Sequence, residues 1–216
     1  MRLFLSSYRL GARPEMFAAL AGGNRRVALI LSAGDAWGNV VHETRVGEQT
    51  AMLRDIGLEA MDVDLRKYAG RGEELSRELA GYCSVWVAGG NTFVLRRAMY
   101  DSSFDRIIAR MLREDAIAYG GYSASICVLA PSLRGLELVD DPAEVAQAGA
   151  GEVLWDGLGI LSYTPVPHFQ SELPESEQID DVVRFLEGAR VPYKTMRDGE
   201  VIYVDGEIEA LLETRI

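Results

Sequence analysis

The sequence contains few residues of the kinds that usually bind metals or form disulfides. Its 216 residues include two cysteines, Cys83 and Cys127, and two histidines, His42 and His168. These four residues lack the clustered spacing of zinc ligands, so we expect no metal site. Both cysteines stand in or beside apolar segments, which predicts buried free thiols in a reducing compartment. The sequence also lacks the dinucleotide fingerprint G-x-G-x-x-G and the lysine of a phosphate-binding P-loop.

Long apolar runs and excess positive charge are also missing. No stretch reaches 18 consecutive apolar residues, which predicts no transmembrane helix, and the apolar run at the N-terminus is too short for a signal peptide. We therefore expect a cytoplasmic protein. Lys and Arg number 22 against 33 Asp and Glu, for a net charge of -11. An acidic surface repels phosphate backbones and anionic membranes, so neither nucleic acid nor a membrane is expected as a partner.

Short apolar runs alternate with amphipathic runs along most of the chain. This alternation predicts one α/β domain over residues 1–216, with a mostly parallel sheet flanked by helices on both faces. The expected strands are 1–5, 26–31, 59–64, 84–87, 117–120 and 160–163, and the expected helices are 14–20, 43–56, 73–79, 104–112, 124–129 and 179–186. Near the C-terminus two Asp-Gly pairs predict antiparallel hairpins, which would join 193–196 to 201–204 and then to 207–212.

A serine stands where a predicted strand meets a predicted helix. The segment Gly121-Tyr122-Ser123-Ala124-Ser125 nearly matches the nucleophile elbow G-x-S-x-G. In such an elbow the tight turn lifts the hydroxyl above the sheet, and the helix N-terminus points N–H groups at a developing oxyanion. The alternative is an ordinary Gly-Ser turn in which Ser123 caps the helix. The residues by themselves leave both interpretations open.

Two further segments have features that a catalytic site would use. Gly89-Gly90-Asn91 follows a predicted strand and precedes a helix, so its backbone could approach a ligand closely; the alternative is an ordinary turn capped by Asn91. His168 lies between Pro167 and Phe169 in a stiff segment. This stiffness suits a general base, and the alternative is a packed loop histidine.

A serine and histidine pair also needs an acid that orients the imidazole. The candidates are Asp140 and Asp141 before the histidine, and Asp198 and Glu200 after it. Sequence spacing does not choose among them, because the order of triad residues differs between folds.

Taken together and in order, these segments resemble the serine peptidase family of peptidase E and cyanophycinase. The matching pieces are Leu5-Ser6-Ser7, Gly89-Gly90-Asn91-Thr92-Phe93, Gly121-Tyr122-Ser123-Ala124, Pro167-His168-Phe169, Leu173-Pro174-Glu175 and Arg197-Asp198-Gly199. The resemblance covers nearly the whole chain. It implies a fold like that of class I glutamine amidotransferases, with serine rather than cysteine at the elbow.

The resemblance also implies roles for individual residues. Ser123 would be the nucleophile and His168 the base, with the backbone N–H groups of Gly90 and Ala124 as the oxyanion hole. The peptidase E pattern places the acid on the segment of Asp140 and Asp141, of which we favour Asp141. The pattern of cyanophycinase-like members places it after the histidine, at Asp198. Such an enzyme needs no metal or cofactor, takes a short peptide as substrate, and is a monomer or homodimer.

Two positions depart from the family pattern. Ser125 replaces the usual glycine of the elbow, which would crowd the turn. Peptidase E also carries an arginine shortly after its histidine that grips an N-terminal aspartate, whereas no Lys or Arg lies between His168 and Arg184 here. We therefore expect a dipeptidase or exopeptidase without strong preference for N-terminal aspartate, unless Arg96, Arg97 or Arg134 reaches the pocket.

Two other functions remain as alternatives. One is a catalytically silent relative that binds a peptide or small molecule. The other is a glutamine amidotransferase, which the expected fold would accommodate. An amidotransferase would need cysteine at the elbow, and Cys127 lies four residues beyond Ser123.

Overall fold

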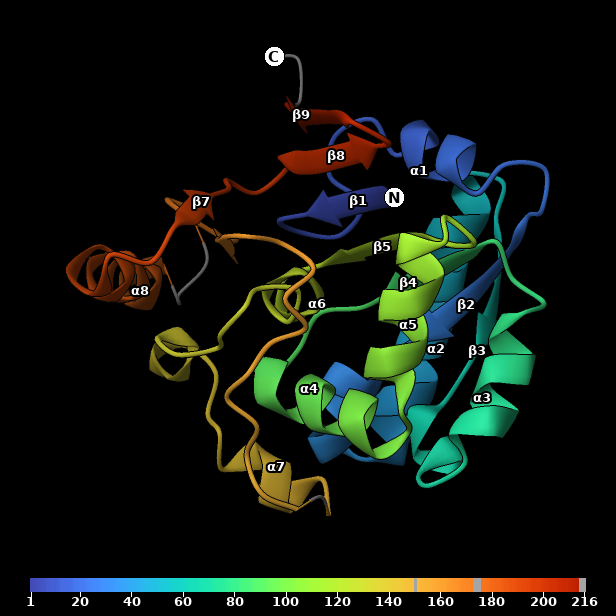
Figure 1. The fold of residues 1–216 in the computed structure, drawn as a ribbon, viewed down its shortest axis with the longest axis horizontal. Coiled ribbons are helices and arrows are strands. Elements are labelled where there is room, and N and C mark those ends of the chain that lie inside the picture. Colours follow the sequence, from blue (N-terminus) through green and yellow to red (C-terminus); the bar gives the residue numbers. More distant parts are fainter. Residues whose placement is uncertain (150, 173–175, 214–216) are drawn as a thin grey trace.

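A seven-stranded sheet forms the centre of the molecule, with strand order β3-β2-β4-β5-β1-β8-β9 (Figure 1). The structure is a computed structural model that describes residues 1–149, 151–172 and 176–213. The strands of this sheet are β1 Arg2–Ser6, β2 Arg26–Ile30, β3 Glu59–Asp62, β4 Ser84–Val87, β5 Ala118–Tyr122, β8 Val201–Asp205 and β9 Ile208–Leu212. The first five are parallel, and β8 and β9 are antiparallel additions at the edge next to β1. The predicted α/β class with a mostly parallel sheet is confirmed.

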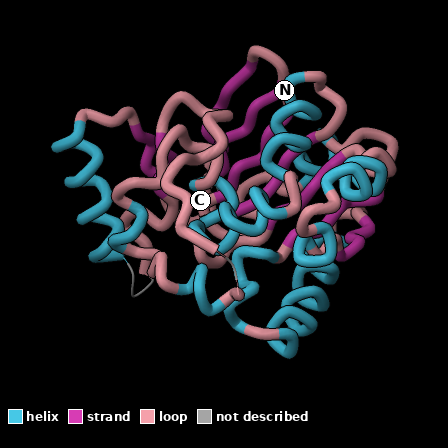
Figure 2. Tube along the Cα trace, turned by 60° about the horizontal axis from the view of Figure 1, so that its bottom comes forward, coloured by secondary structure: helices cyan, strands magenta, loops and turns pink. Residues whose placement is uncertain are grey.

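Helices cover both faces of this sheet, because each central strand presents apolar side chains to both sides. Phe4 and Trp86 pack with Phe17 beneath helices α1 and α2, whereas Leu5 and Val87 face the opposite layer. Figure 2 shows the strands with helices on either side. The helices are α1 Glu15–Leu20, α2 Asn39–Asp55, α3 Gly72–Leu79, α4 Thr92–Asp101, α5 Phe104–Arg113, α6 Ala124–Cys127, α7 Glu144–Gln147 and α8 Ser176–Ala189.

The C-terminal third differs from the sequence prediction in two places. The strand predicted at 160–163 forms later, as β6 Thr164–Val166, because the N–H groups of Ile160 and Leu161 both bond to the Leu129 carbonyl instead of a neighbouring strand. The strand β7 Tyr193–Thr195 pairs in parallel with β6 in a separate small sheet, so its predicted hairpin with 201–204 is wrong.

The residues 197–200 therefore connect two sheets rather than two strands of one hairpin. Strand β8 leaves this turn and pairs with β1, with Val201 opposite Ser6. The second predicted hairpin is confirmed, since β8 and β9 are antiparallel and Gly206 turns between them with φ of 63°. Of the two cysteines, Cys127 is buried as predicted, but Cys83 is only partly buried.

The carboxyl ends of the parallel strands meet at one edge of the sheet. Ser7 follows β1, Gly89 and Gly90 follow β4, and Ser123 follows β5. Strands β4 and β5 are neighbours, as are β5 and β1, so these residues lie side by side in space. Ligands of open α/β sheets bind at this edge.

Candidate active site

Ser123 occupies a strained turn between β5 and α6. Its backbone has φ of 56° and ψ of -122°, a combination that L-residues rarely adopt. It precedes the first helical residue, yet its side chain makes no capping hydrogen bond. Helix capping therefore does not account for the serine. A strained strand-to-helix turn with a free hydroxyl has the geometry of a nucleophile elbow.

The loop after β4 lies against this turn. A Cβ added to Gly89 would lie 3.0 Å from the Ser123 Cβ, and one added to Gly90 would lie 2.6 Å from the Ala33 carbonyl oxygen. Gly90 also has φ of 143°, which favours glycine. Within the described residues, the N–H groups of Gly90 and Ala124 bond to no backbone acceptor. Both are free to bind an oxygen next to Ser123.

His168 and Asp198 form a hydrogen-bonded pair beside the elbow. His168 follows β6 and Asp198 follows β7, and His168 Nδ1 lies 2.7 Å from Asp198 Oδ1. Because the two strands are parallel, their carboxyl ends bring both residues to the same edge of the small sheet. The chain is tied there by the Phe169 N–H, which donates to the Met196 carbonyl at 3.0 Å.

Ser7, at the end of β1, connects this pair to the large sheet. Its buried Oγ accepts a hydrogen bond from the His168 backbone N–H at 2.9 Å and lies 3.1 Å from Asp198 Oδ1. A hydroxyl can accept the first bond and donate the second. Ser7 belongs to one of the segments that carry the family resemblance, but the resemblance implies no role for it. Its position directly after a buried strand, at the edge where sites form, was the available signal.

Asp140 and Asp141 line the same cavity but are engaged by other partners. Asp140 Oδ2 accepts from the Thr92 N–H at the start of α4, and Asp141 Oδ1 accepts from the Ala143 N–H. Burial raises the pKa of Asp140. Among the described residues Asp198, not the favoured Asp141, holds the His168 ring. The reason is the pairing of β7 with β6, which the hairpin prediction had excluded.

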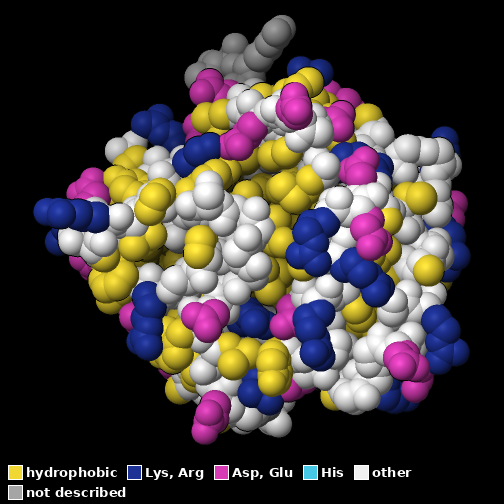
Figure 3. Space-filling view, in the orientation of Figure 1, with side chains coloured by type: hydrophobic (Ala, Val, Ile, Leu, Met, Phe, Trp, Pro, Cys, Tyr) yellow, Lys and Arg dark blue, Asp and Glu magenta, His cyan; other side chains and the backbone are white. Residues whose placement is uncertain are grey.

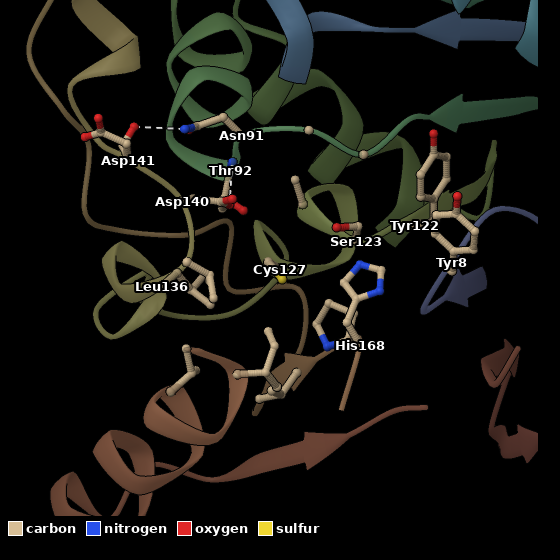
Figure 4. Close-up of a pocket in the computed structure, with 18 of the residues that line it drawn as sticks. Tyr8, Asn91, Thr92, Tyr122, Ser123, Cys127, Leu136, Asp140, Asp141 and His168 are labelled. Atoms are coloured by element: carbon tan, nitrogen blue, oxygen red, sulfur yellow. Dashed lines mark hydrogen bonds between the residues drawn. The ribbon is translucent and has the colours of Figure 1, made fainter. Parts of the chain in front are cut away.

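A cavity of about 570 Å³ opens onto these groups. Figure 4 shows the Ser123 hydroxyl and the His168 ring projecting into it next to one another, with Asp140 and Thr92 further along its wall. The volume lies in the range of small-ligand pockets, roughly 300–1,000 Å³. Pocket-lining residues also include Trp37 and Arg45, which sequence analysis missed because nothing in their local pattern marks them.

Arginines that the sequence analysis named as possible pocket residues are engaged elsewhere. Arg96 pairs with Asp105, Arg97 pairs with Asp101, and the Arg134 guanidinium lies over the Trp155 ring. None of the three lines the cavity. The predicted motif Leu173-Pro174-Glu175 lies outside the described residues.

Ser125 and Cys127 follow Ser123 in helix α6, and Cys127 also lines the cavity. Burial raises the pKa of the Cys127 thiol well above its ordinary value, which keeps it protonated and unreactive. Ser125 is fully buried and its Oγ donates to the Tyr122 carbonyl at 2.9 Å. The serine in place of the usual glycine therefore packs beneath the turn, where it bonds to backbone.

Three further observations concern metal ligands, membrane-spanning helices and the charges on one face of the molecule. No group of three or more possible metal ligands occurs among the residues that the structure describes, and no helix there is long and apolar enough to span a bilayer. On the face in Figure 3 basic side chains are scattered among acidic ones rather than gathered in one patch.

Comparison with known proteins gives one consistent family. The model of peptidase family S51 matches residues 5–211. Peptidase E of Streptomyces coelicolor is 28% identical over 174 residues, which cover 77% of this chain and 64% of that protein. The aligned chain thus spans less than two thirds of this relative's length.

Two solved structures share the fold. A crystal structure described as a peptidase E protein from Listeria monocytogenes EGD-e superposes with a TM-score of 0.80 at 19% identity, covering 99% of this chain and 98% of that one. A peptidase from an acI-B1 Actinobacterium gives a TM-score of 0.66 at 15% identity, covering 98% and 93%. At these identities the likeness concerns the fold.

Proposed function

The chain belongs to peptidase family S51, and on that basis we propose that it is a serine peptidase that hydrolyses short peptides through Ser123, His168 and Asp198. The observation that carries the proposal is the 2.7 Å contact between His168 Nδ1 and Asp198 Oδ1 beside the strained turn of Ser123. A serine and an imidazole that line the same cavity, with a carboxylate holding the imidazole, are the parts of a catalytic triad.

The acid sets the tautomer of the base. An ionised carboxylate only accepts hydrogen bonds, so the proton between the two residues resides on His168 Nδ1. Nε2 then keeps its lone pair and takes the proton from Ser123 Oγ as that oxygen attacks the scissile carbonyl carbon. The Asp198 carboxylate stabilises the imidazolium that results, without itself becoming protonated.

The free backbone N–H groups supply the electrostatic part of the reaction. As the Ser123 Oγ–carbon bond forms, the carbonyl oxygen gains negative charge, and the N–H groups of Gly90 and Ala124 would donate to it. Each such donor contributes roughly 10²–10³-fold to the rate. Their backbone is fixed beforehand, because Gly90 packs against Ala33 and Ala124 opens helix α6.

The second half of the reaction uses the same groups in reverse. The His168 imidazolium donates its proton to the leaving amine as the carbon–nitrogen bond breaks, which leaves an acyl group on Ser123. A water then gives one proton to His168 and attacks the acyl carbon, and His168 returns that proton to Ser123 Oγ as the bond between this oxygen and the acyl carbon breaks. The cavity of about 570 Å³ suits one or two residues on either side of the scissile bond, which supports a dipeptidase or exopeptidase.

The test is covalent labelling with a fluorophosphonate probe, which reacts with activated serines and requires no knowledge of the substrate. We expect labelling of the wild type at Ser123, identified by peptide mass, and none in Ser123→Ala. His168→Ala should label far more slowly, whereas Ser132→Ala, a serine outside the cavity, should label normally. An unlabelled wild type that still binds peptides would instead identify a catalytically silent binding protein.

A dipeptide library then defines the substrate. Release of free amino acids from dipeptides, but not from longer peptides, would support the dipeptidase assignment. Release of dipeptides from longer substrates would replace it with another exopeptidase activity.

A further inference from the structure

Arg45 of helix α2 is the one cation among the described residues that line the cavity. Its Nη2 donates to the Gly89 carbonyl at 2.6 Å, and its guanidinium carbon lies 4.8 Å from the centre of the Trp37 ring. A Cβ added to Gly34 would overlap Arg45 Nη1, so only glycine leaves room for the guanidinium there. The loop after β4 and the 3-10 helix Ser32–Trp37 thus hold the guanidinium of this α2 residue in one place.

Arg45 differs from the other partly buried arginines because no acid neutralises it. Arg2, Arg96 and Arg97 each form an ion pair with an aspartate, but no ion pair within the described part of the chain includes Arg45. Its Nη1 is also buried without a hydrogen-bond acceptor. A half-buried cation without an anion is costly, and this protein carries eleven more negative than positive charges. The arrangement fits an anion that arrives with the ligand.

The position of the charge connects it to the proposed chemistry. Arg45 binds the carbonyl of Gly89, and the next N–H along the backbone is that of Gly90, a proposed oxyanion donor. Because these two groups of one trans peptide point in opposite directions, the guanidinium lies about one peptide unit away from where the scissile carbonyl oxygen would sit. A short peptide offers two carboxylates within a few bonds of that carbonyl: its C-terminal carboxylate and an acidic side chain.

We propose that Arg45 is a specificity residue that binds a carboxylate of the substrate. The proposal rests on the proposed peptidase function and adds a recognition site to it. Arginine suits the task, because its planar guanidinium presents paired donors to the two oxygens of a carboxylate. Trp37, whose side chain is 44% exposed, covers the guanidinium and shields the contact from water.

The experiment measures kcat and KM for matched peptides that differ in one carboxylate. Ala-Phe against Ala-Phe amide tests the C-terminal carboxylate, and Asp-Phe amide against Asn-Phe amide tests the side chain. We expect wild type to favour the carboxylate in at least one pair by tenfold or more in kcat/KM, mainly through KM. Arg45→Gln should abolish that preference and Arg45→Lys should reduce it. Arg54→Gln, at an exposed position of the same helix, should retain it.

Binding measurements separate this proposal from the proposed function. In the Ser123→Ala background, calorimetry with the same four peptides needs no turnover, so it tests Arg45 even if hydrolysis fails. A carboxylate preference that disappears in the Arg45→Gln double variant supports the site. Equal binding within both pairs, no binding of any of the four, or a preference unchanged by Arg45→Gln would overturn it. Fluorophosphonate labelling of wild type reports on the nucleophile independently of all four peptides.

Discussion

Asp198 Oδ1 lies within hydrogen-bond distance of His168 Nδ1, at 2.7 Å, although the two residues lie 30 positions apart in the sequence. Neither is placed by its immediate neighbours. Each follows one strand of the parallel pair β6–β7, and the Oγ of Ser7 contacts both at the end of β1. The small sheet therefore aligns the proposed base with its acid, and one serine ties that pair to the edge where the proposed nucleophile lies.

Replacement of the orienting acid should identify it. We expect Asp198→Asn to lower kcat by roughly 10³–10⁴-fold, because an amide can hold the imidazole in the wrong tautomer. Asp141→Asn is the matched control, since its carboxylate bonds to the Ala143 N–H, and we expect less than a fivefold loss. Steady-state kinetics on the best library dipeptide measures both. A larger loss in Asp141→Asn or Asp140→Asn than in Asp198→Asn would contradict the assignment.

Removal of the Ser123 hydroxyl should separate activity from stability. We expect Ser123→Ala to abolish measurable hydrolysis while its thermal midpoint stays within a few degrees of wild type, because the Oγ caps nothing in the fold. Ser123→Gly should be equally inactive but more stable than Ser123→Ala, since glycine tolerates φ of 56° without steric cost. Thermal melts and turnover together check this. Wild-type turnover in either variant would refute the serine mechanism.

The order of elements in the first 130 residues could be predicted from the sequence because local signals agreed there. Continuous apolar strands such as 26–31 and amphipathic stripes such as 104–112 each specify one kind of element. Ser123 and Gly90 could also be predicted as candidate site residues, because a strand-turn-helix junction with small residues has a recognisable sequence pattern.

The sequence offered Asp198 among several acids but could not single it out, because its contact with His168 depends on a strand pairing of long sequence separation. The sequence Arg197-Asp198-Gly199-Glu200 is typical of a hairpin turn. In the structure, however, β7 pairs with β6 and β8 pairs with β1, so the two strands that flank this turn do not pair with each other. The role proposed for Arg45 could not be predicted from the sequence for a related reason. An arginine on a largely exposed helix has no local feature that shows a cavity wall beside it.

We expect the close packing of Ser125 against Gly121 to require glycine at position 121. Ser125 Oγ packs against the bare Cα of Gly121, and a Cβ there would also overlap the Val87 carbonyl oxygen. We expect Gly121→Ala to lower the free energy of unfolding by roughly 1–3 kcal/mol or more, as overpacking does. Ser125→Gly should keep activity within about threefold, because the Ser125 hydroxyl bonds to the Tyr122 carbonyl and does not line the cavity. Urea denaturation and kinetics on both variants check this. A large gain in activity from Ser125→Gly would show that the serine does crowd the elbow.

Ser7 should act as a positioning residue. In Ser7→Ala the buried His168 N–H loses its acceptor and Asp198 loses a neighbour, so we expect kcat to fall about tenfold or more. An unsatisfied buried N–H also costs roughly 1–3 kcal/mol of stability. The pH dependence of kcat/KM distinguishes the two effects, because only altered contacts to the base would move its acidic limb. Ser7→Thr keeps the hydroxyl and should recover part of the activity; an unshifted pH profile in Ser7→Ala would mean that its role is purely structural.

Asp35 should make stability depend on pH in an unusual direction. Its side chain is 4% exposed, and burial raises its pKa to about 6 despite the nearby Arg66. In the unfolded chain the group titrates near 4, so between about pH 4 and pH 6 the folded state binds the proton and the unfolded state does not. The contribution of Asp35 to the free energy of unfolding is therefore most favourable at low pH and falls as pH rises to about 6. Above that it stays constant.

Asp35→Asn removes this titration, so the difference between variant and wild type isolates it from every other carboxylate. We expect the unfolding free energy of the variant, relative to wild type, to rise by up to about 3 kcal/mol from pH 4 to pH 8, two pKa units at roughly 1.4 kcal/mol each. Urea denaturation at pH 4, 5, 6, 7 and 8 measures it, and Asp55→Asn, at an exposed position of α2, is the control that should show no such trend. A difference between Asp35→Asn and wild type that is the same at every pH would mean that Asp35 is already ionised throughout and that Arg66 offsets its burial.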